Sequence, residues 1–268
     1  MIPKIIHYCW FGRGEKSKLI KKCINSWKKY CPDYEIIEWN EDNFDVDQTI
    51  WTKQAYEAKK WAFVADYVRL YALYNYGGIY CDTDVELVRP IDNLLDNKGF
   101  SGFEKEPIIL VQTGIIGAEK GFDIVKYLLS YYEGRNFKKA DGTYDTTTNT
   151  HITTTILEKN GFVANGKLQS VNGFTLYTKD YFAPKDFYTG RIEKTKNTAC
   201  IHHYNLSWLD EAGRKHWEKV RAKNRVKQTK YYIAHIPNLV LLKILGVNRY
   251  NSFKKYISGA LKKKQERV

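Results

Sequence analysis

Two carboxylates follow a short apolar run in the segment 77–85, which has the sequence GGIYCDTDV. Asp82 and Asp84 are two positions apart, and side chains at this spacing point to the same side of an extended chain. Because two ionised neighbours repel each other, the pair needs a cation between them. A divalent metal bound by one or two carboxylates and by substrate phosphates meets that need. The segment therefore predicts a metal and diphosphate site at the end of a strand, although Asp-Thr-Asp also suits a surface turn.

A second charged pair precedes these acids on a predicted helix. The segment 53–75 is rich in Ala, Leu, Tyr and Trp and contains no Gly or Pro, which favours one long helix that ends at Gly77. Asp66 and Arg69 are three positions apart and share one face of that helix. The pair is either part of a binding site or a surface ion pair, which usually contributes little to stability.

These segments together resemble a known family. The runs ADYVRLYALY at 65–74 and YGGIYCDTD at 76–84 resemble the signature of the DXD-containing sugar-binding glycosyltransferases, glycosyltransferase family 32. That family includes bacterial capsular polysaccharide enzymes and fungal mannosyltransferases, and the glucosyltransferase domains of the large bacterial cytotoxins share the pattern. The opening IPKIIHYCWFG at 2–12 and the later ACIHHYNLSW at 199–208 resemble it as well. The resemblance implies an enzyme, a hexosyltransferase.

The resemblance assigns catalytic roles to four residues. Asp66 and Arg69 are implied to hold hydroxyl groups of the donor sugar, Asp82 to contact the ribose and the metal shell, and Asp84 to bind the metal directly. An oxygen-rich ligand set favours Mn²⁺ or Mg²⁺ as the cofactor. A cation on the diphosphate offsets the charge of the departing nucleotide as the glycosidic bond breaks.

Residues near both ends of the resemblance complete the implied site. Trp10 follows the first predicted strand and is implied to stack on the nucleobase, unless it is a core aromatic. Only one of His202 and His203 can face a pocket from a strand, and the family pattern favours His202 as a metal ligand, unless both are structural. Ser207 and Trp208 are implied to bind the metal and the β-phosphate, although the equivalent toxin residues are not adjacent.

The polar segment 146–155, TTTNTHITTT, lies between these blocks. Its hydroxyl groups and its amide could line a sugar pocket, or the segment could begin a helix with its N-cap at Asn149 or Thr150. The cap explains most of the segment. Asn149 and His151 remain candidates for contacts with the acceptor.

Short apolar runs alternate with helix-like segments in the N-terminal half, at 2–10, 17–30 and 34–39. This alternation predicts an α/β fold with a mostly parallel central sheet and flanking helices, and the resemblance implies the GT-A type of nucleotide-binding fold. Further strands are expected at 100–104, 108–116 and 198–203, and a further helix at 121–132. The 268 residues suit one catalytic domain over 1–210 and a basic helical C-terminal extension over 211–268.

The net charge of +13 lies entirely in the C-terminal extension, which has 16 basic and 3 acidic residues. Its apolar stretch 239–245 is too short to span a bilayer, which takes about 20 residues. A basic segment with an apolar face fits an anionic membrane surface, although 239–245 could instead pack on the core. Nucleic acid is a rival partner for a basic tail, but the balanced charge of the body and the metal–sugar motifs argue against it.

The five cysteines lack C-x-x-C spacing and predict reduced thiols of a cytoplasmic protein rather than a disulfide framework or a zinc site. We expect no secretion signal, because no positively charged leader or apolar h-region is visible before the first strand. We therefore expect a cytoplasmic protein that is peripheral on the inner face of the cell membrane.

The resulting hypothesis is a metal-dependent retaining glycosyltransferase that moves a hexose from a nucleotide sugar, with UDP-sugars favoured over GDP-mannose, to a saccharide or a polyprenyl-linked saccharide. Capsular or other cell-surface polysaccharide synthesis is the expected setting. Retention comes from the resemblance, and the absence of an evident nucleophile favours front-face attack. Two alternatives stay open: a toxin-like effector that glycosylates a protein, and a non-catalytic protein that binds sugar nucleotides or membranes.

Overall fold

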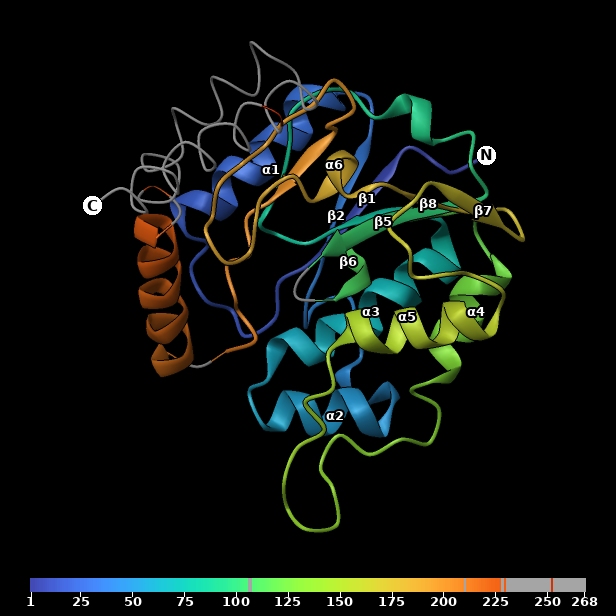
Figure 1. Cartoon of the computed structure of the whole chain (residues 1–268). Helices are drawn as coiled ribbons and strands as arrows, with labels where there is room; N and C mark the ends of the chain where they lie inside the picture. Colours follow the sequence, from blue (N-terminus) through green and yellow to red (C-terminus); the bar gives the residue numbers. More distant parts are fainter. Residues whose placement is uncertain (106–107, 210, 228, 230–251, 253–268) are drawn as a thin grey trace. The chain divides into compact units, whose positions relative to one another are not determined.

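The computed structural model describes residues 1–105, 108–209, 211–227, 229 and 252 (Figure 1). The chain divides into two compact units, Met1–Lys215 and His216–Val268. Residues 211–227 are helical, and the apolar stretch 239–245 lies outside the described residues. Within the described part of the chain, no helix has the length and the apolar character needed to cross a bilayer.

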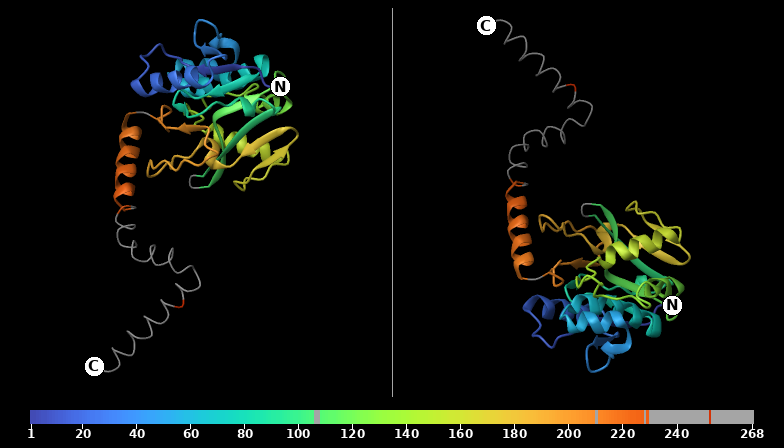
Figure 2. Two further views of the ribbon diagram at one scale, coloured as in Figure 1. Left: turned by 90° about the horizontal axis from the view of Figure 1, so that it is seen from above. Right: turned by 90° about the horizontal axis from the view of Figure 1, so that it is seen from below.

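The first unit is built on a seven-stranded sheet with the order β2-β1-β3-β6-β5-β8-β7 (Figure 1). Its strands are β1 (Ile5–Cys9), β2 (Glu35–Trp39), β3 (Gly78–Cys81), β5 (Gly99–Lys105), β6 (Ile109–Ala118), β7 (Gln169–Val171) and β8 (Phe174–Tyr177). In Figure 2 the colours of these strands run across the sheet from the blue N-terminal end to the yellow edge of β8 and β7.

The α/β class is confirmed, but the prediction of a mostly parallel sheet is wrong. Parallel pairs join β1 to β2, β1 to β3 and β5 to β8, whereas β6 is antiparallel to both β3 and β5, and β7 is antiparallel to β8. The parallel strands β2, β1 and β3 belong to the N-terminal half, where helices connect the strands. Consecutive strands that pair directly, without a helical crossover, run antiparallel and make the sheet mixed.

Helices cover both faces of the sheet (Figure 1). Helices α3 (Trp61–Tyr76), α4 (Asp123–Ser130) and α5 (Asn149–Lys159) lie on one face, and α2 (Ile50–Glu57) packs against α3. Helices α1 (Lys18–Tyr30) and α6 (Lys179–Phe182) lie on the other face. Val68 and Leu73 belong to the apolar core on the α3 side, and Trp27 and Ile79 belong to the second core on the α1 side.

Smaller elements complete the unit. Strands β4 (Val85–Leu87) and β9 (Cys200–His202) form a separate antiparallel pair, and two 3-10 helices cover Val46–Gln48 and Asp92–Leu94. All five cysteines are free and buried, as the prediction of reduced thiols requires.

The single helix predicted over 53–75 is two helices, because the chain leaves the helical conformation at Lys59. Lys59 has φ 55°, its N–H donates to Tyr56 O, and Lys60 N–H donates to Ala55 O. This is the pair of hydrogen bonds of a Schellman motif, in which glycine usually occupies the left-handed position. Since lysine stands there, the break has no sequence signal.

A buried histidine fixes the turn that connects α3 to β3. His7 Nε2 lies 2.7 Å from Gly77 O and therefore donates to it, while His7 Nδ1 accepts from Trp39 Nε1 at 3.1 Å. Burial lowers the pKa of His7 to about 4, against the opposite effect of the Gly77 bond, so the ring is neutral. The contacts tie the end of α3 to β1 and β2 and so set where β3 begins.

We expect Gly78→Ala to lower the free energy of unfolding by about 2–5 kcal/mol, because it combines backbone strain with overpacking. Gly78 has φ +108°, and a Cβ atom there would lie 2.7 Å from Ile5 O. Gly121→Ala is the matched control, because Gly121 has φ +73° but nothing within 4 Å of a new Cβ. Urea unfolding should show a smaller loss of about 1–2 kcal/mol for the control. Equal losses would show that the close approach at Gly78 is unimportant.

Candidate active site

The two acids of the D-x-D segment lie in a turn and not on an extended strand. Strand β3 ends at Cys81, Asp82 N–H donates to Gly114 O of β6 at 2.7 Å, and Val85 N–H donates to Asp82 O at 2.9 Å. The last bond closes a four-residue turn that leads into β4. The prediction that extended geometry aligns the acids is therefore wrong, and the turn itself brings them to the site.

Strand β9 brings a histidine to these acids. Val85 of β4 pairs with His202 of β9, and His202 Nε2 lies 3.4 Å from Asp84 Oδ1. His203 Nε2 lies 2.8 Å from Glu86 Oε2 instead. Adjacent strand residues face opposite sides, so the two histidines separate as the sequence predicted.

Asp82, Asp84 and His202 form a group that can hold a divalent cation, with one potential ligand atom of each residue within 4.8 Å of the others. His202 Nδ1 is buried and has no hydrogen-bond partner among the described residues. A Cβ atom at Gly114 would lie 3.1 Å from that nitrogen, so glycine leaves room for the ring. Two carboxylates and an imidazole are a donor set that fits such an ion.

The buried Asp84 and the partly exposed His202 shift each other's pKa strongly. Burial alone would raise the pKa of Asp84, but His202 and the N–H of Asn205, 2.6 Å from Asp84 Oδ2, lower it to about 2. Burial alone would lower the pKa of His202, but Asp84 raises it to about 9. Without a metal, a protonated His202 therefore balances the charge of Asp84, and a bound cation would displace that proton.

Arg69 connects the acids of the turn to helix α3, and its side chain is only 6% exposed. Its Nη2 donates to Asp66 Oδ1 at 2.9 Å and its Nη1 to Thr113 O at 2.8 Å. Nη1 also lies 3.2 Å from Asp82 Oδ1, and the guanidinium lies 4.6 Å from the centre of the Tyr80 ring. The alternative of an exposed ion pair between Asp66 and Arg69 is therefore excluded.

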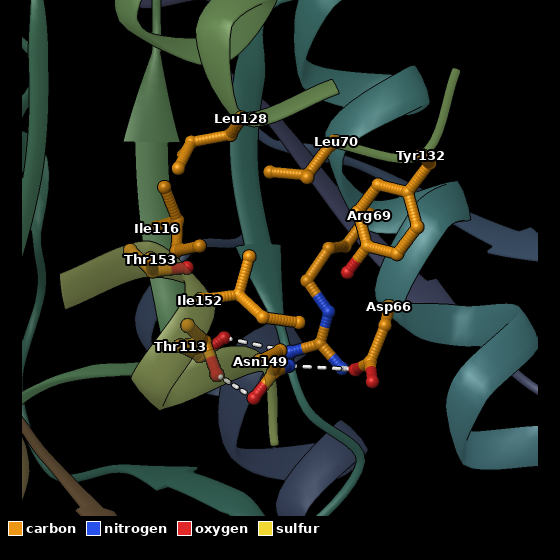
Figure 3. Close-up of a pocket in the computed structure, with 10 residues that line it drawn as sticks. All are labelled: Asp66, Arg69, Leu70, Thr113, Ile116, Leu128, Tyr132, Asn149, Ile152 and Thr153. Atoms are coloured by element: carbon orange, nitrogen blue, oxygen red, sulfur yellow. Dashed lines mark hydrogen bonds and ion pairs between the residues drawn. The ribbon is translucent and has the colours of Figure 1, made fainter. Parts of the chain in front are cut away.

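Asn149, the first residue of α5, completes the arrangement around Asp66. Its Nδ2 donates to Asp66 Oδ1 at 2.6 Å, and its Oδ1 accepts from Thr113 Oγ1 at 2.8 Å. Figure 3 shows these polar groups at one end of a small pocket whose other end is apolar. The pocket is lined by Asp66, Arg69, Leu70, Thr113, Ile116, Leu128, Tyr132, Asn149, Ile152 and Thr153. Burial raises the pKa of Asp66 to about 6, and Arg69 opposes that rise.

Four other predicted residues lie outside this hydrogen-bonded group. Trp10 follows β1 at the same end of the sheet as Asp82; its Nε1 donates to Gly14 O at 2.7 Å, and Lys16 Nζ lies 5.3 Å from its ring centre. His151 is exposed and bonds to Thr148 Oγ1. Ser207 and Trp208 are exposed in the turn after β9. Their assigned roles stay predictions.

The main chain of β6 is the part of the site that the sequence interpretation missed. Thr113 O accepts from Arg69, and Gly114 O accepts from Asp82 N–H. The available signal was the polar run Gln-Thr-Gly inside an otherwise apolar strand, ILVQTGIIGA. Glycine inside a strand often marks a bulge or a close backbone approach.

Comparison with known proteins gives a family match over the same residues. Residues 17–101 match the family described as "Glycosyltransferase sugar-binding region containing DXD motif". The matched range contains Asp66, Arg69, Asp82 and Asp84, which confirms the resemblance inferred from the sequence.

Fungal relatives share part of the chain. Inositol phosphoceramide mannosyltransferase 3 of Schizosaccharomyces pombe is 37% identical over 101 residues, which are 35% of this chain and 27% of the relative. Mannosyl phosphorylinositol ceramide synthase CSH1 of Saccharomyces cerevisiae is 32% identical over 107 residues, 37% of this chain and 27% of the relative. The chain thus spans about a quarter of the length of these curated relatives. Among solved structures, "PaToxG Glycosyltransferase" is 23% identical with a TM-score of 0.47, covering 59% of this chain and 69% of that one.

The His202–Asp84 pair predicts how the stability of the metal-free protein depends on pH. A pKa raised from 6.5 to about 9 means that the stabilisation is fully present below pH 6.5 and is lost as the pH rises through about 9. Thermal unfolding in EDTA should show a fall in Tm over this range that His202→Gln reduces. Parallel Tm profiles for the wild type and the variant would contradict the ion pair.

Proposed function

We propose that the chain belongs to the family of glycosyltransferases whose sugar-binding region contains a DXD motif, and that it transfers a hexose from a nucleoside diphosphate sugar to a saccharide hydroxyl group. One observation carries the proposal. The possible cation ligands Asp82, Asp84 and His202 converge within 4.8 Å, and Arg69 links Asp82 to Asp66 in the adjoining polar pocket. We also propose that the α/β unit is of the GT-A type.

The proposed cofactor is Mn²⁺ or Mg²⁺, which Asp82, Asp84 and His202 would hold. Such a cation, when bound, neutralises charge on the diphosphate as the bond to the sugar breaks. Arg69 acts mainly by holding other groups, because its Nε, Nη1 and Nη2 donate to Ala65 O, Thr113 O and Asp66 respectively. The sugar hydroxyl groups are then left to Asp66 and Asn149.

We therefore assign Asn149 to binding of the donor sugar, in place of the predicted contact with the acceptor. Asn149 shares Oδ1 of Asp66 with Arg69. The second hydrogen on its amide nitrogen can donate a hydrogen bond to a ligand, and the Oδ2 atom of Asp66 can accept one. A pair of neighbouring sugar hydroxyl groups, each both donor and acceptor, matches them.

We propose retention of the anomeric configuration with front-face attack by the acceptor. A covalent intermediate would require a carboxylate that is free to attack the sugar carbon. Asp66 is the buried carboxylate of the pocket, and its Oδ1 already accepts hydrogen bonds from Arg69 and Asn149, which lowers its nucleophilicity. The configuration of the transferred sugar, read by NMR, tests this step.

The wider setting is also a proposal. A saccharide or polyprenyl-linked saccharide acceptor, in capsular or other cell-surface polysaccharide synthesis, fits a cytoplasmic enzyme peripheral on the inner face of the membrane. The excess of basic residues from Glu211 to Val268 supports attraction to anionic lipid. UDP-hexoses remain favoured as donors, and the mannosyltransferase names of the fungal relatives put GDP-mannose beside them.

A panel of sugar nucleotides with Mn²⁺ tests the assignment through nucleotide release. One donor should be hydrolysed slowly, EDTA should stop the reaction, and Asp84→Ala should abolish it because a carboxylate ligand is lost. Asp96→Ala is the control, because Asp96 is an exposed acid outside the site. Full activity of Asp84→Ala would contradict the assignment as a metal-dependent glycosyltransferase. Nucleotide binding without hydrolysis or transfer would favour a binding protein, and transfer to protein but not to oligosaccharides would favour an effector.

The variant Asn149→Ala tests whether Asn149 contacts the donor sugar or the acceptor substrate. We expect about a tenfold lower kcat/KM for hydrolysis of the sugar nucleotide in the absence of acceptor, because one hydrogen bond to the transition state is lost. The affinity for the nucleoside diphosphate without sugar should not change. His151→Ala, on the exposed side of the same helical turn, serves as the control. An effect of Asn149→Ala that appears only with acceptor present would restore its acceptor role.

A further inference from the structure

We propose that Gln112, a buried residue of β6, positions both halves of the active site by clamping a bulge in that strand; this inference rests on the proposed function. The bulge is visible in the pairing of β5 with β6. Phe100 pairs with Gly117 and Gly102 pairs with Gln112. Ser101 alone therefore faces the four residues 113–116, so the strands cannot form a regular ladder there.

The side chain of Gln112 replaces the ladder bonds that the bulge loses. Gln112 is 1% exposed, and its Nε2 donates to Ile115 O at 2.8 Å while its Oε1 accepts from Ile115 N–H at 3.1 Å. Nε2 also donates to Ser101 Oγ at 2.9 Å, and that hydroxyl lies 2.8 Å from Gln112 O and 2.9 Å from Ile115 O. These two side chains thus supply partners for the main chain on both sides of residues 113 and 114.

The two clamped residues reach both parts of the site. Thr113 O accepts from Arg69 Nη1, and Thr113 Oγ1 donates to Asn149, so Thr113 serves the sugar pocket. Gly114 O accepts from Asp82 N–H, so Gly114 serves the metal group. Three groups of the site therefore bond to the bulge of β6: the Arg69 side chain of α3, the Asn149 side chain of α5 and the Asp82 N–H of the β3–β4 turn.

The shape of that loop depends on the amide of Gln112. Its Oε1 would lie 3.3 Å from a Cβ atom at Gly114, and the ring of His202 would lie 3.1 Å from the same atom. Residue 114 is thus confined between the clamp and a metal ligand. Without the Gln112 amide, the buried N–H and C=O of Ile115 would lose their hydrogen-bond partner. Because leaving them unpaired is unfavourable, they would bond to other groups. The loop would then turn Thr113 O and Gly114 O away from Arg69 and Asp82.

The test replaces the amide without changing the volume of the side chain. Gln112→Met keeps the shape and removes the hydrogen bonds. Because a misplacement of about 1 Å at an active site can cost roughly 10²-fold in rate, we expect kcat for donor hydrolysis to fall by that order. At saturating Mn²⁺, KM for the sugar nucleotide should change less than kcat, because Trp10 at the predicted nucleobase end lies outside the clamp. Ser101→Ala, which removes one part of the clamp, should lower kcat in the same direction but less.

A control separates this role from a loss of stability. Thr52→Val breaks the capping box between Thr49 and Thr52 at the start of α2, away from the site, and should lower the Tm. The Thr52 variant is expected to keep the wild-type kcat at a temperature where all the variants are folded. A kcat of Gln112→Met that falls no further than that of Thr52→Val would overturn the proposal.

Binding of Mn²⁺ followed by electron paramagnetic resonance gives a readout that needs no turnover. Gln112→Met should bind Mn²⁺ at least severalfold more weakly than the wild type, because Asp82 is no longer held by Gly114 O. Equal affinities would contradict the proposal even if the wild-type protein turned over a donor. A wild-type protein that binds Mn²⁺ and loses affinity on Gln112→Met, yet hydrolyses no donor, would retain the positioning role and refute the proposed function.

Discussion

The buried charge of Arg69 is the constraint on which the site depends. Removing a guanidinium from water is unfavourable unless hydrogen bonds and opposite charges surround it. Here Asp66 and Ala65 O come from its own helix, Asp82 follows β3, and Thr113 O belongs to β6. A single side chain therefore requires helix α3 to lie against the end of β3 beside β6. This requirement explains why the antiparallel strand β6 is placed next to the parallel strands.

The balance of charge around Arg69 also explains why the neighbouring group can take a cation. At neutral pH, three carboxylates face one guanidinium and, in the absence of metal, one imidazolium at His202. One negative charge remains in a largely buried region. Exchange of the His202 proton for a divalent cation removes that remainder. The same Asp84 that raises the pKa of His202 thus prepares a site in which a metal and a proton compete.

The part of the site that follows from the sequence is the part that local spacing determines. Asp66 and Arg69 must share a helix face, Asp82 and Asp84 must follow the apolar strand, and only one of His202 and His203 can face inward. The break at Lys59 could not be predicted, because a lysine occupies the left-handed position where glycine usually marks the end of a helix. The mixed sheet was missed for a similar reason, since strand direction depends on which strands pair and not on their composition.

The role of Asn149 shows the limit of assigning residues from a polar segment. A run of threonines around an amide is compatible with a helix cap and with a pocket, and the structure contains elements of both. Helix α5 begins at Asn149 with Thr148 in the cap position, but no side chain forms the capping bond. The amide instead bridges Asp66 and Thr113. The hydroxyl of Thr148 lies 2.8 Å from His151 Nδ1, so the first turn of α5 makes a local side-chain contact as well as the contact with the distant pocket.

The contacts of Arg69 and Asn149 also limit which groups can recognise a ligand. Because Arg69 directs its Nε, Nη1 and Nη2 donors to protein groups, it holds the carboxylates of Asp66 and Asp82 in fixed directions. The groups with capacity for a ligand are then the second oxygen of Asp66, the second amide hydrogen of Asn149, one remaining Nη2 hydrogen of Arg69 and the metal group. Selectivity in the pocket thus depends on a few acceptors and donors whose positions are fixed by a residue that need not touch the sugar. A site organised in this way can change its preferred sugar through α5 while the buried charge that orders it stays the same.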